Sequence, residues 1–429
     1  MKPDKITNPS NENSSCFDDL YARGIIKKTS NDEAVQSLID QGKAILYWGT
    51  DPTGVSAHTG HLMGLITLKR LQNFDNKVII LLGGATGLIG DPSGKSNERV
   101  LLSNDEVQVN QKLLLESISQ VIDLSSDSDT EVVNNKDWFQ RMNIPDFLRD
   151  VGKNFSLSTM LKLESVKSRL DSEVGISFTE FTYSLLQAFD FKYLYTKYGC
   201  NLQVGGSDQY GNIIAGIDYT RRSCGGKVYG LTTPLISTAS GEKMGKSVQG
   251  GAIWLSPELT SPYDFYQYWI NTADSDVEKM LLIYTFEPID KIKQIVKEDI
   301  IAAKELLAFA VTSIVHSEEQ AEQAKETSAD LFSGQGGNAA GMPEIFISDK
   351  KLKQGVEFTT LMVDAGLAGS KSAVRRLIQQ GGAYLNDSVI KDVVYKITEN
   401  DLTDNSLILR SGKKKYCRVS ISLTNQSEV

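Results

Sequence analysis

The chain has 429 residues, which is too long for one ordinary core and predicts roughly three domains of ~100–200 residues each. Hydrophobic residues make up 40% of the sequence and charged residues 23%, which is the composition of an ordinary soluble globular protein. The longest apolar stretch of interest, Val78 to Ile89, is interrupted by glycines, and a membrane helix needs ~20 consecutive apolar residues. We therefore expect no membrane-spanning segment.

Charge is unevenly distributed along the chain. The net charge is −9 at pH 7, yet residues 350–420 hold thirteen Lys and Arg against seven Asp and Glu, a net of +6, so the remainder carries −15. An acidic body with a basic tail is the pattern expected for RNA contact. A solvated basic face without a partner is the alternative reading of charge alone.

The cysteines and the N-terminus bear on the compartment. The cysteines, at positions 16, 200, 224 and 417, form no CxxC pair, so we expect neither disulfides nor a zinc site, and a reducing cytoplasm fits. The N-terminus carries Asp4, Glu12, Asp18 and Asp19 and lacks an apolar core. It matches neither a secretory signal nor an Arg-rich transit peptide, so a bacterial cytoplasm is favoured over a mitochondrion.

Strands and helices alternate in the first half of the chain. Apolar patterns predict a strand at 44–48, a helix at 61–74, a strand at 78–82 that runs into the loop GGATGLIGDPSG, a helix at 181–198 and a strand–loop–helix unit at 201–216. This alternation is typical of a parallel nucleotide-binding sheet. We expect a Rossmann-like α/β catalytic domain over residues 1–248, with a helical insertion at about 110–200.

The second half is predicted to be helical and then mixed. Residues 262–330 are amphipathic at helical spacing, which predicts an all-helical domain over 249–332. A linker at 333–349 includes SGQGGNAAGMP, which is rich in glycine and free of charge. A small α+β domain follows at 350–425. Its first helix spans 358–366, and its second is capped by Ser370 or Ser372 and ends before Gly381.

Two histidines mark the first candidate site. His58 and His61 occur in the phrase HTGH at the start of the 61–74 helix, where free backbone N–H groups and the positive end of the helix dipole favour an anion such as an ATP phosphate. Gly60 would let a nucleotide ring approach the backbone. A metal pair or simple capping histidines are the alternatives, although only Asp51 is an acidic neighbour in sequence.

Two lysines mark the second candidate site. Lys243 and Lys246 lie in GEKMGKS, a loop flanked by glycines. Lysines on such a loop can close over a polyphosphate and stabilise the charge that develops during displacement. On its own this pattern is also common in surface loops.

Together the two sites form a specific pattern. PTGVSAHTGH, followed ~180 residues later by KMGKS, resembles the paired signatures of the class I aminoacyl-tRNA synthetases. YWGTDPTG, GGATGLIGDPSGK, GISFTEF, LLQAFDF, LQVGGSDQYGN and SPYDFYQYWINT, in this order, are similar to the tyrosyl-tRNA synthetases of the bacterial and organellar type. The resemblance runs from about residue 20 to residue 420.

This resemblance implies a tyrosine pocket. Tyr47 and Asp190 match the two positions that hydrogen-bond the phenol hydroxyl, and a buried pair of this kind rejects phenylalanine because its polar groups would lose their partner. Tyr183 and Gln187, four residues apart on one helix face, match the residues that grip the substrate amino group. Asp91 and Gln203 complete the polar wall.

The resemblance also implies an ATP site. Its residues are Asp51 and Gly60 on the adenosine side, Asp208 and Gln209 near the ribose and the tyrosine carboxylate, Ile236 at the adenine and Lys246 at the phosphates. The implied catalytic residues are His58, His61, Lys243 and Lys246. ATP is expected as a substrate accompanied by Mg²⁺, and we expect no metal site built from protein ligands alone.

The remaining partners follow from the same resemblance. The C-terminal domain resembles a small RNA-binding module of a ribosomal protein, and Lys371, Arg375, Arg376, Lys413 and Lys414 are its candidate contacts with the tRNA for tyrosine. Family members form homodimers through the inserted region.

The sequence departs from the common family pattern at several places. Tyr210 replaces a usual tryptophan, KMGKS replaces KFGKT, GVSA replaces Ala-Asp-Ser-Leu, and Trp48 and Thr50 replace a smaller residue and an aromatic one. None of these changes removes an implied catalytic group.

Two other kinds of protein share parts of this pattern. A tryptophanyl-tRNA synthetase shares the fold and both signatures, but the polar pair Tyr47 and Asp190 suits a phenol, and the C-terminal RNA module favours the tyrosine enzyme. An RNA-binding or splicing protein that retains the fold would not need both histidines, both lysines and the whole pocket.

Overall fold

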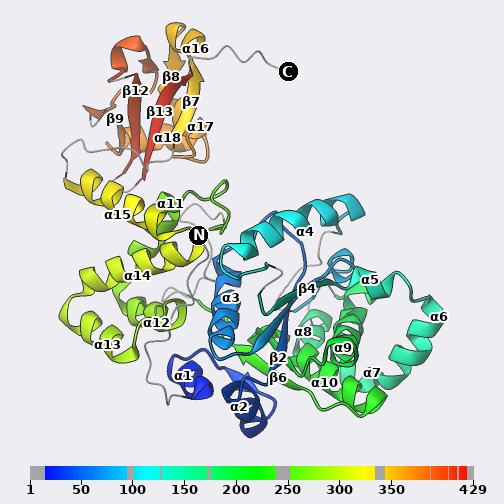
Figure 1. The fold of residues 1–429 in the computed structure, drawn as a ribbon. Helices are drawn as coiled ribbons and strands as arrows, with labels where there is room; N and C mark the ends of the chain where they lie inside the picture. Colours follow the sequence, from blue (N-terminus) through cyan, green and yellow to red (C-terminus); the bar gives the residue numbers. More distant parts are fainter. Residues whose placement is uncertain are drawn as a thin grey trace. The chain divides into compact units, whose positions relative to one another are not determined.

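The computed structural model describes residues 15–93, 101–125, 128–171, 175–237, 252–333, 344–386, 388–403, 405–412 and 415–422. The chain divides into two compact units (Figure 1). The first holds the described residues of 1–247 together with 252–260 and 269–316, and the second holds 261–268 and the described residues from 317 onward. Within the described ranges, no helix is long and apolar enough to cross a membrane.

A six-stranded sheet forms the centre of the first unit. Its strands are β1 (Lys28–Thr29), β2 (Ile45–Thr50), β3 (Lys77–Leu82), β4 (Thr130–Asn134), β5 (Leu202–Gly206) and β6 (Tyr229–Thr233), in the order β1-β6-β5-β2-β3-β4. All neighbouring strands are parallel except β1, which is antiparallel to β6. From β2 the chain proceeds outward to β3 and β4 and then returns to β5 on the other side of β2. The predicted parallel sheet is confirmed, and its strand order reverses between β2 and β5.

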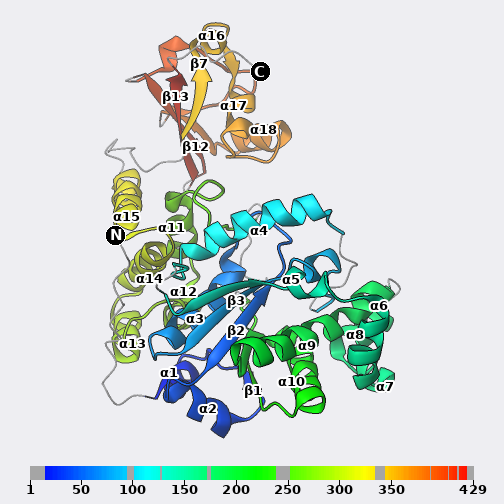
Figure 2. The same ribbon diagram turned by 45° about the vertical axis from the view of Figure 1, so that its right-hand side comes forward.

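Helices pack on both faces of this sheet (Figure 2). The helices of the unit are α1 (Cys16–Ala22), α2 (Asp32–Asp40), α3 (Thr59–Gln72), α4 (Asn104–Ser119), α5 (Lys136–Phe139), α6 (Ile144–Asp146), α7 (Leu157–Met160), α8 (Glu164–Leu170), α9 (Phe178–Tyr198), α10 (Tyr210–Cys224), α12 (Asp274–Tyr284), α13 (Ile289–Glu298) and α14 (Ile300–Val315). Single turns η1 to η4 lie at Thr86–Leu88, Phe147–Val151, Gly152–Asn154 and Ser207–Gln209.

The long helices are explained by their apolar faces and caps. On α3 the predicted positions Leu62, Leu65 and Ile66 are fully buried, which confirms the helical spacing. On α9 the Ser177 side chain accepts a hydrogen bond from the Glu180 backbone N–H, which begins the helix with a capping box. Gly199, at φ +71°, ends it in the left-handed conformation that glycine adopts without strain.

One strand lies inside the range predicted as a helical insertion. Residues Thr130–Asn134 form β4, the edge strand beside β3, so the run of short helices begins only after it. The strand is only five residues long, and its first three side chains are not buried. An exposed edge strand has weak apolar alternation, and this is why the sequence pattern did not reveal it.

The second unit includes a small α+β fold. Its elements are α11 (Pro262–Ile270, up to residue 268 in this unit), α15 (Glu318–Ser333), β7 (Glu344–Ser348), α16 (Asp349–Lys353), β8 (Val356–Glu357), α17 (Phe358–Asp364), α18 (Lys371–Gln379), β9 (Ala383–Leu385), β10 (Ser388–Val389), β11 (Lys396–Ile397), η5 (Glu399–Asp401), β12 (Ser406–Ser411) and β13 (Lys415–Ser422). Five strands form a sheet in the order β10-β9-β12-β13-β7, and β8 pairs with β11.

The helices of this fold begin where the sequence predicted. The Ser370 side chain accepts a hydrogen bond from the Ala373 backbone N–H, so Ser370 rather than Ser372 caps α18. Phe358 of α17 and Val374 of α18 are fully buried in a core shared with the sheet. Gly381 follows α18 at φ +70°. Of the predicted linker at 333–349, residues 334–343 lie outside the described residues, and Glu344–Ser348 form β7, which pairs in parallel with β13.

Candidate active site

The predicted tyrosine and ATP residues meet in one pocket. It has a volume of about 390 Å³ and lies at the carboxyl ends of the central strands, where the strand order reverses. The predicted residues that line it are Tyr47, Asp51, His58, Gly60, His61, Asp91, Tyr183, Gln187, Asp190, Gln203, Asp208, Gln209 and Ile236. Lys243 and Lys246 lie outside the described residues.

One end of the pocket is walled by buried polar groups. Tyr47 of β2 is 1% exposed, and Gln203, its neighbour on β5, is 3% exposed. The Tyr47 hydroxyl and the Gln203 Oε1 have no hydrogen-bond partner among the described residues. Burial, followed by the charge of the nearby Asp190, raises the pKa of Tyr47 well above its usual value. Because buried polar atoms are normally satisfied, this end of the pocket is suited to a ligand with polar groups.

Asp190 is held by two residues that the sequence pattern did not identify. Trp138 Nε1 donates to Asp190 Oδ1 at 2.8 Å, and Asn135 Nδ2 donates to Oδ2 at 3.1 Å. Burial raises the pKa of Asp190 to about 8, while these two hydrogen bonds oppose the shift. Asn135 directly follows β4, and the general rule that ligands bind at the carboxyl ends of parallel strands could have identified it.

A second hydrogen-bonded network joins Asp51 to Tyr183. The Tyr183 hydroxyl donates to Asp51 Oδ2 at 2.8 Å, and Thr86 Oγ1 donates to Asp51 Oδ1 at 2.7 Å. Asn135 Nδ2 also donates to Thr86 Oγ1 at 2.9 Å, which connects this network to Asp190. A Cβ at Gly83 would lie 1.9 Å from Asp51 Oδ1, so only glycine leaves room for this carboxylate. Tyr183, which is predicted to bind the substrate amino group, is thus hydrogen-bonded to Asp51, which is predicted to lie on the adenosine side.

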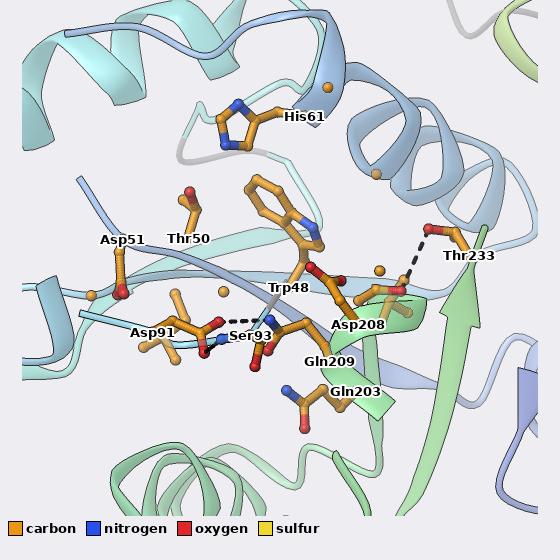
Figure 3. A pocket seen from close by; sticks show the side chains of 18 of the residues that line it. Trp48, Thr50, Asp51, His61, Asp91, Ser93, Gln203, Asp208, Gln209 and Thr233 are labelled. Atoms are coloured by element: carbon orange, nitrogen blue, oxygen red, sulfur yellow. Dashed lines mark hydrogen bonds between the residues drawn. The ribbon is translucent and has the colours of Figure 1, made fainter. Parts of the chain in front are cut away.

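A third network includes Asp91, Ser93 and Gln209 (Figure 3). Gln209 Nε2 donates to Asp91 Oδ2 at 2.7 Å, and the Ser93 backbone N–H donates to Asp91 Oδ1 at 2.9 Å. Asn212 Nδ2 donates to Gln187 Oε1 at 2.9 Å. Asn212 is 4% exposed and was not identified from the sequence, because it lies on the buried side of α10. Asp91 and Gln187 are therefore fixed before any ligand arrives.

The two histidines begin α3. His58 Nδ1 accepts a hydrogen bond from the Gly60 backbone N–H at 3.0 Å, and His61 Nδ1 accepts one from the His58 backbone N–H at 3.2 Å. Their ring centroids lie 4.1 Å apart. With Nδ1 accepting in both rings, each neutral ring carries its proton on Nε2. A Cβ at Gly60 would lie 2.7 Å from the His58 ring, so the glycine is needed for this arrangement.

His61 is neutral at physiological pH. Its enclosure by protein, followed by the neighbouring His58, lowers the pKa of His61 to about 3. The ring can therefore donate one hydrogen bond to a phosphate oxygen without carrying a positive charge. The capping alternative considered from the sequence is correct for Nδ1 of both rings, and both histidines also line the pocket.

Several other pocket residues were not predicted as site residues. Trp48 of β2 lies beside His61 with ring centroids 6.2 Å apart, and a Cβ at Gly64 would lie 2.8 Å from the Trp48 Nε1. Tyr284, the last residue of α12, also lines the pocket. Tyr284 is far from both signatures in sequence, so no local pattern points to it.

The predicted RNA contacts are partly described. Lys371, Arg375 and Arg376 are exposed residues of α18. Lys371 Nζ lies 3.0 Å from Glu357 Oε2 in an exposed ion pair. Lys413 and Lys414 lie outside the described residues.

Comparison with known proteins gives consistent matches. A family model described as class I tRNA synthetases (W and Y) matches residues 40–333, and one described as the SYY-like C-terminal domain of tyrosine–tRNA ligase matches residues 337–419. A tyrosine–tRNA ligase of Treponema denticola is 46% identical over 405 residues, covering 94% of this chain and 98% of that protein. One from Clostridium botulinum strain Hall is 40% identical over 411 residues, covering 95% and 100%.

Solved structures agree with the sequence matches. A C-terminally truncated mitochondrial tyrosyl-tRNA synthetase of Coccidioides posadasii has a TM-score of 0.63 and 31% identity, covering 73% of this chain and 91% of that one. The corresponding protein of Aspergillus nidulans has a TM-score of 0.66 and 29% identity, covering 74% and 94%.

Proposed function

Because the chain belongs to the tyrosyl-tRNA synthetases, we propose that it activates L-tyrosine with ATP and transfers the product to its cognate tRNA. The first step yields tyrosyl-adenylate and pyrophosphate, and the second esterifies tyrosine to the 3′ end of the tRNA. One observation carries the choice of amino acid. The Tyr47 hydroxyl, buried beside Asp190 and unsatisfied among the described residues, lines the same pocket as the two histidines.

In this proposal the substrate phenol meets Tyr47 and Asp190. Phenylalanine would leave the buried Tyr47 hydroxyl unsatisfied, at a cost of about 1–3 kcal/mol, and would offer no hydrogen bond to Asp190. The substrate ammonium meets Tyr183, Gln187 and Asp91. The existing bonds from Tyr183 to Asp51 and from Asn212 to Gln187 support this role, because they fix the acceptors in advance. Gln203 completes this wall with its unsatisfied Oε1.

The adenylation step is an in-line displacement. A carboxylate oxygen of tyrosine bonds to the α-phosphorus of ATP while the bond to the β-phosphate oxygen breaks, and pyrophosphate leaves with its electrons. We assign the Nε2 protons of His58 and His61 to the phosphates and Lys243 and Lys246 to the departing pyrophosphate. No residue becomes covalently attached, so catalysis depends on position and on charge stabilisation.

The nucleoside of ATP is assigned to the residues around α3 and η4. We place the ribose near Asp208 and Gln209 and the adenine near Gly60 and Ile236, with Asp51 on the adenosine side. The described residues contain no group of three His, Cys, Asp or Glu side chains that could hold a metal ion. We propose that Mg²⁺ enters bound to the ATP phosphates, since Mg²⁺ commonly binds through substrate phosphates, and we assign no step to it.

The test is amino-acid-dependent exchange of pyrophosphate into ATP, followed by charging of tRNA. We expect exchange with tyrosine and none with tryptophan or phenylalanine. Exchange with tryptophan alone would identify the tryptophan enzyme instead. Binding of structured RNA without formation of tyrosyl-adenylate would favour the RNA-binding alternative.

We also propose that residues 350–425 bind tRNA and that 249–332 lie on the anticodon side. The exposed positive charges of Arg375 and Arg376 on α18 support the first assignment. Deleting residues 334–429 should weaken tRNA charging and leave pyrophosphate exchange intact. An equal loss of tRNA charging and of pyrophosphate exchange would contradict the assignment of tRNA binding to residues 350–425.

A homodimer is proposed through the inserted region. Large apolar side chains are exposed on its short helices and at the start of α9, including Ile144 at 75%, Leu157 at 61% and Phe178 at 77%. Large apolar side chains exposed within one region of a chain favour a protein interface, and the occupant proposed here is a second copy of the chain.

We propose that the protein works in the cytoplasm. All four cysteines are free, and three of them are buried, as expected in a reducing compartment. Fractionation of the source cells, followed by immunodetection, tests this location, and enrichment in a mitochondrial fraction would contradict it.

A further inference from the structure

Residues 253–256 follow the lysine loop, and the role that we infer for them rests on the proposed function. This segment runs beside the residues that lead into α3. The Thr59 backbone N–H donates to Ile253 O at 3.0 Å, and the Leu255 backbone N–H donates to Ala57 O at 2.8 Å. These two bonds flank His58, which forms an antiparallel bridge with Trp254. The backbone of the first signature is therefore paired with a segment about 200 residues away in the chain.

Side chains reinforce this pairing on both sides. The Ser256 backbone N–H donates to Ser56 Oγ at 3.3 Å, and Ser56 Oγ donates to Ala57 O at 2.8 Å. The Ala57 backbone N–H donates to Ser117 Oγ of α4 at 2.8 Å. Ser56 and Ser117 are 2% and 1% exposed. Buried hydrogen bonds of this kind fix a backbone, because breaking one leaves a buried polar group unsatisfied.

The Trp254 side chain contacts His58 directly. The two ring centroids lie 6.0 Å apart with the planes at 60°, and the His61 ring lies 4.1 Å from the His58 ring. A Cβ at Gly54 would lie 3.7 Å from the far edge of the indole, so the tryptophan also covers the loop that follows β2. The Trp254 backbone N–H donates to Thr260 Oγ1 at 3.0 Å, which anchors the segment from its own side.

We propose that Trp254 is a positioning residue for His58. The indole limits the rotation of the imidazole, so that Nδ1 stays on the Gly60 N–H and Nε2 stays directed at the ligand. The backbone pairing of residues 253–256 fixes the backbone around His58, and the indole of Trp254 restricts the imidazole ring of His58. Trp254 does not line the pocket and touches no substrate in this account. Its effect on adenylation passes through His58 alone.

The test compares Trp254→Ala, Trp254→Phe and His58→Ala in tyrosine-dependent pyrophosphate exchange. Loss of the indole is expected to lower kcat by about 10- to 100-fold, since small misplacements of a reacting group have effects of this size. The KM for tyrosine should stay unchanged, because the tyrosine end of the pocket is untouched. Trp254→Phe should retain most of the activity, since its ring can still contact the imidazole.

A double-mutant cycle separates positioning from a general structural role. In the His58→Ala background, Trp254→Ala should have no further effect on kcat, because the ring it positions is gone. Leu259→Ala is the matched control, because Leu259 lies in the same connection and is 47% exposed. It should leave kcat unchanged. Thermal melting establishes that each variant is folded, and Trp254→Leu replaces Trp254→Ala in the cycle if the alanine variant does not fold.

Two results would overturn the proposal. The first is an equal loss of kcat from the Trp254 substitution with and without His58. The second is an unchanged kcat in the Trp254 variant that keeps His58. If the wild-type protein shows tyrosine-dependent pyrophosphate exchange, either result contradicts only the role of Trp254 and not the proposed function. A wild type without tyrosine-dependent exchange would instead remove the function on which the inference rests.

Discussion

Trp138 Nε1 donates a hydrogen bond of 2.8 Å to Oδ1 of Asp190, although 52 residues separate the two in the chain. The other carboxyl oxygen accepts from Asn135, so both oxygens of this buried group are held by residues that follow β4. Asp190 itself is 2% exposed. The position of the carboxyl group that we propose for the substrate phenol is therefore set by Trp138 and Asn135, which are distant from it in sequence.

Trp138→Phe should weaken tyrosine binding. Phenylalanine can keep the stacking that Trp138 makes with Tyr193, whose ring lies 4.3 Å away, but it removes the donor to Asp190. We expect the KM for tyrosine to rise roughly tenfold, since leaving a buried polar group without its hydrogen bond costs about 1–3 kcal/mol. The KM for ATP should not change. Pyrophosphate exchange measures both constants, and an equal rise in the two would contradict this role.

Asp190→Asn should change how stability depends on pH. Burial raises the pKa of Asp190 in the folded protein to about 8, and an unfolded Asp titrates near ~3.9. The folded state thus holds this proton to higher pH, so the contribution of Asp190 to stability is full below ~3.9 and is lost as the pH rises through about 8.

Asparagine does not titrate, so the stability of the variant does not fall with pH through the ionisation of this side chain. The free energy of unfolding of Asp190→Asn, relative to the unsubstituted protein, should therefore increase between about pH 5 and about pH 9. Urea denaturation at a series of pH values measures it. A difference that stays constant across this range would show that the carboxyl of Asp190 does not titrate there.

Phe178→Glu combined with Ile144→Glu should produce a monomer. Both side chains are more than two-thirds exposed in the single chain, and a charge at each would have to be desolvated to form the proposed dimer interface. Ile301→Glu is the control, because Ile301 is 68% exposed on α14, outside the inserted region. Sedimentation velocity measures the mass. A doubly substituted protein that still sediments as a dimer would place the interface elsewhere.

Arg375→Gln with Arg376→Gln should weaken tRNA binding without affecting adenylation. Each lost phosphate contact is expected to reduce the slope of log affinity against log salt concentration by about 0.7–0.9. The matched control is Lys112→Gln on α4, where the side chain is 80% exposed. Filter binding over a salt series gives the slope. An unchanged slope in the arginine variant would exclude α18 from the RNA interface.

Local patterns predicted much of the fold. The helix that became α3 was visible because Leu62, Leu65 and Leu68 recur at helical spacing and are buried. The start of α18 was visible because a serine precedes its apolar face, although only the structure distinguishes Ser370 from Ser372. The helices of residues 144–170 are three to seven residues long, too short to show a period, and their exact bounds could not be predicted.

The residues of the candidate site also fall into those that local sequence patterns identify and those that only the structure identifies. Residues inside the two signature phrases and the matched motifs, such as His58 and Gln187, could be named from the sequence. Asn135, Trp138 and Trp254 could not, because each acts through a contact with a residue distant in sequence. Only the packing of β4 against β3, and of residues 253–256 against the start of α3, brings these side chains to the site.

The most direct test of the account is the preference for tyrosine over phenylalanine, measured as the ratio of kcat/KM in pyrophosphate exchange. The unsubstituted protein should strongly prefer tyrosine. Tyr47→Phe should remain active with a smaller preference, and Asp190→Ala should almost abolish the use of tyrosine, because Asp190 and Tyr47 are the groups assigned to the phenol hydroxyl. An unchanged preference in both variants would contradict the assignment of this pocket to tyrosine.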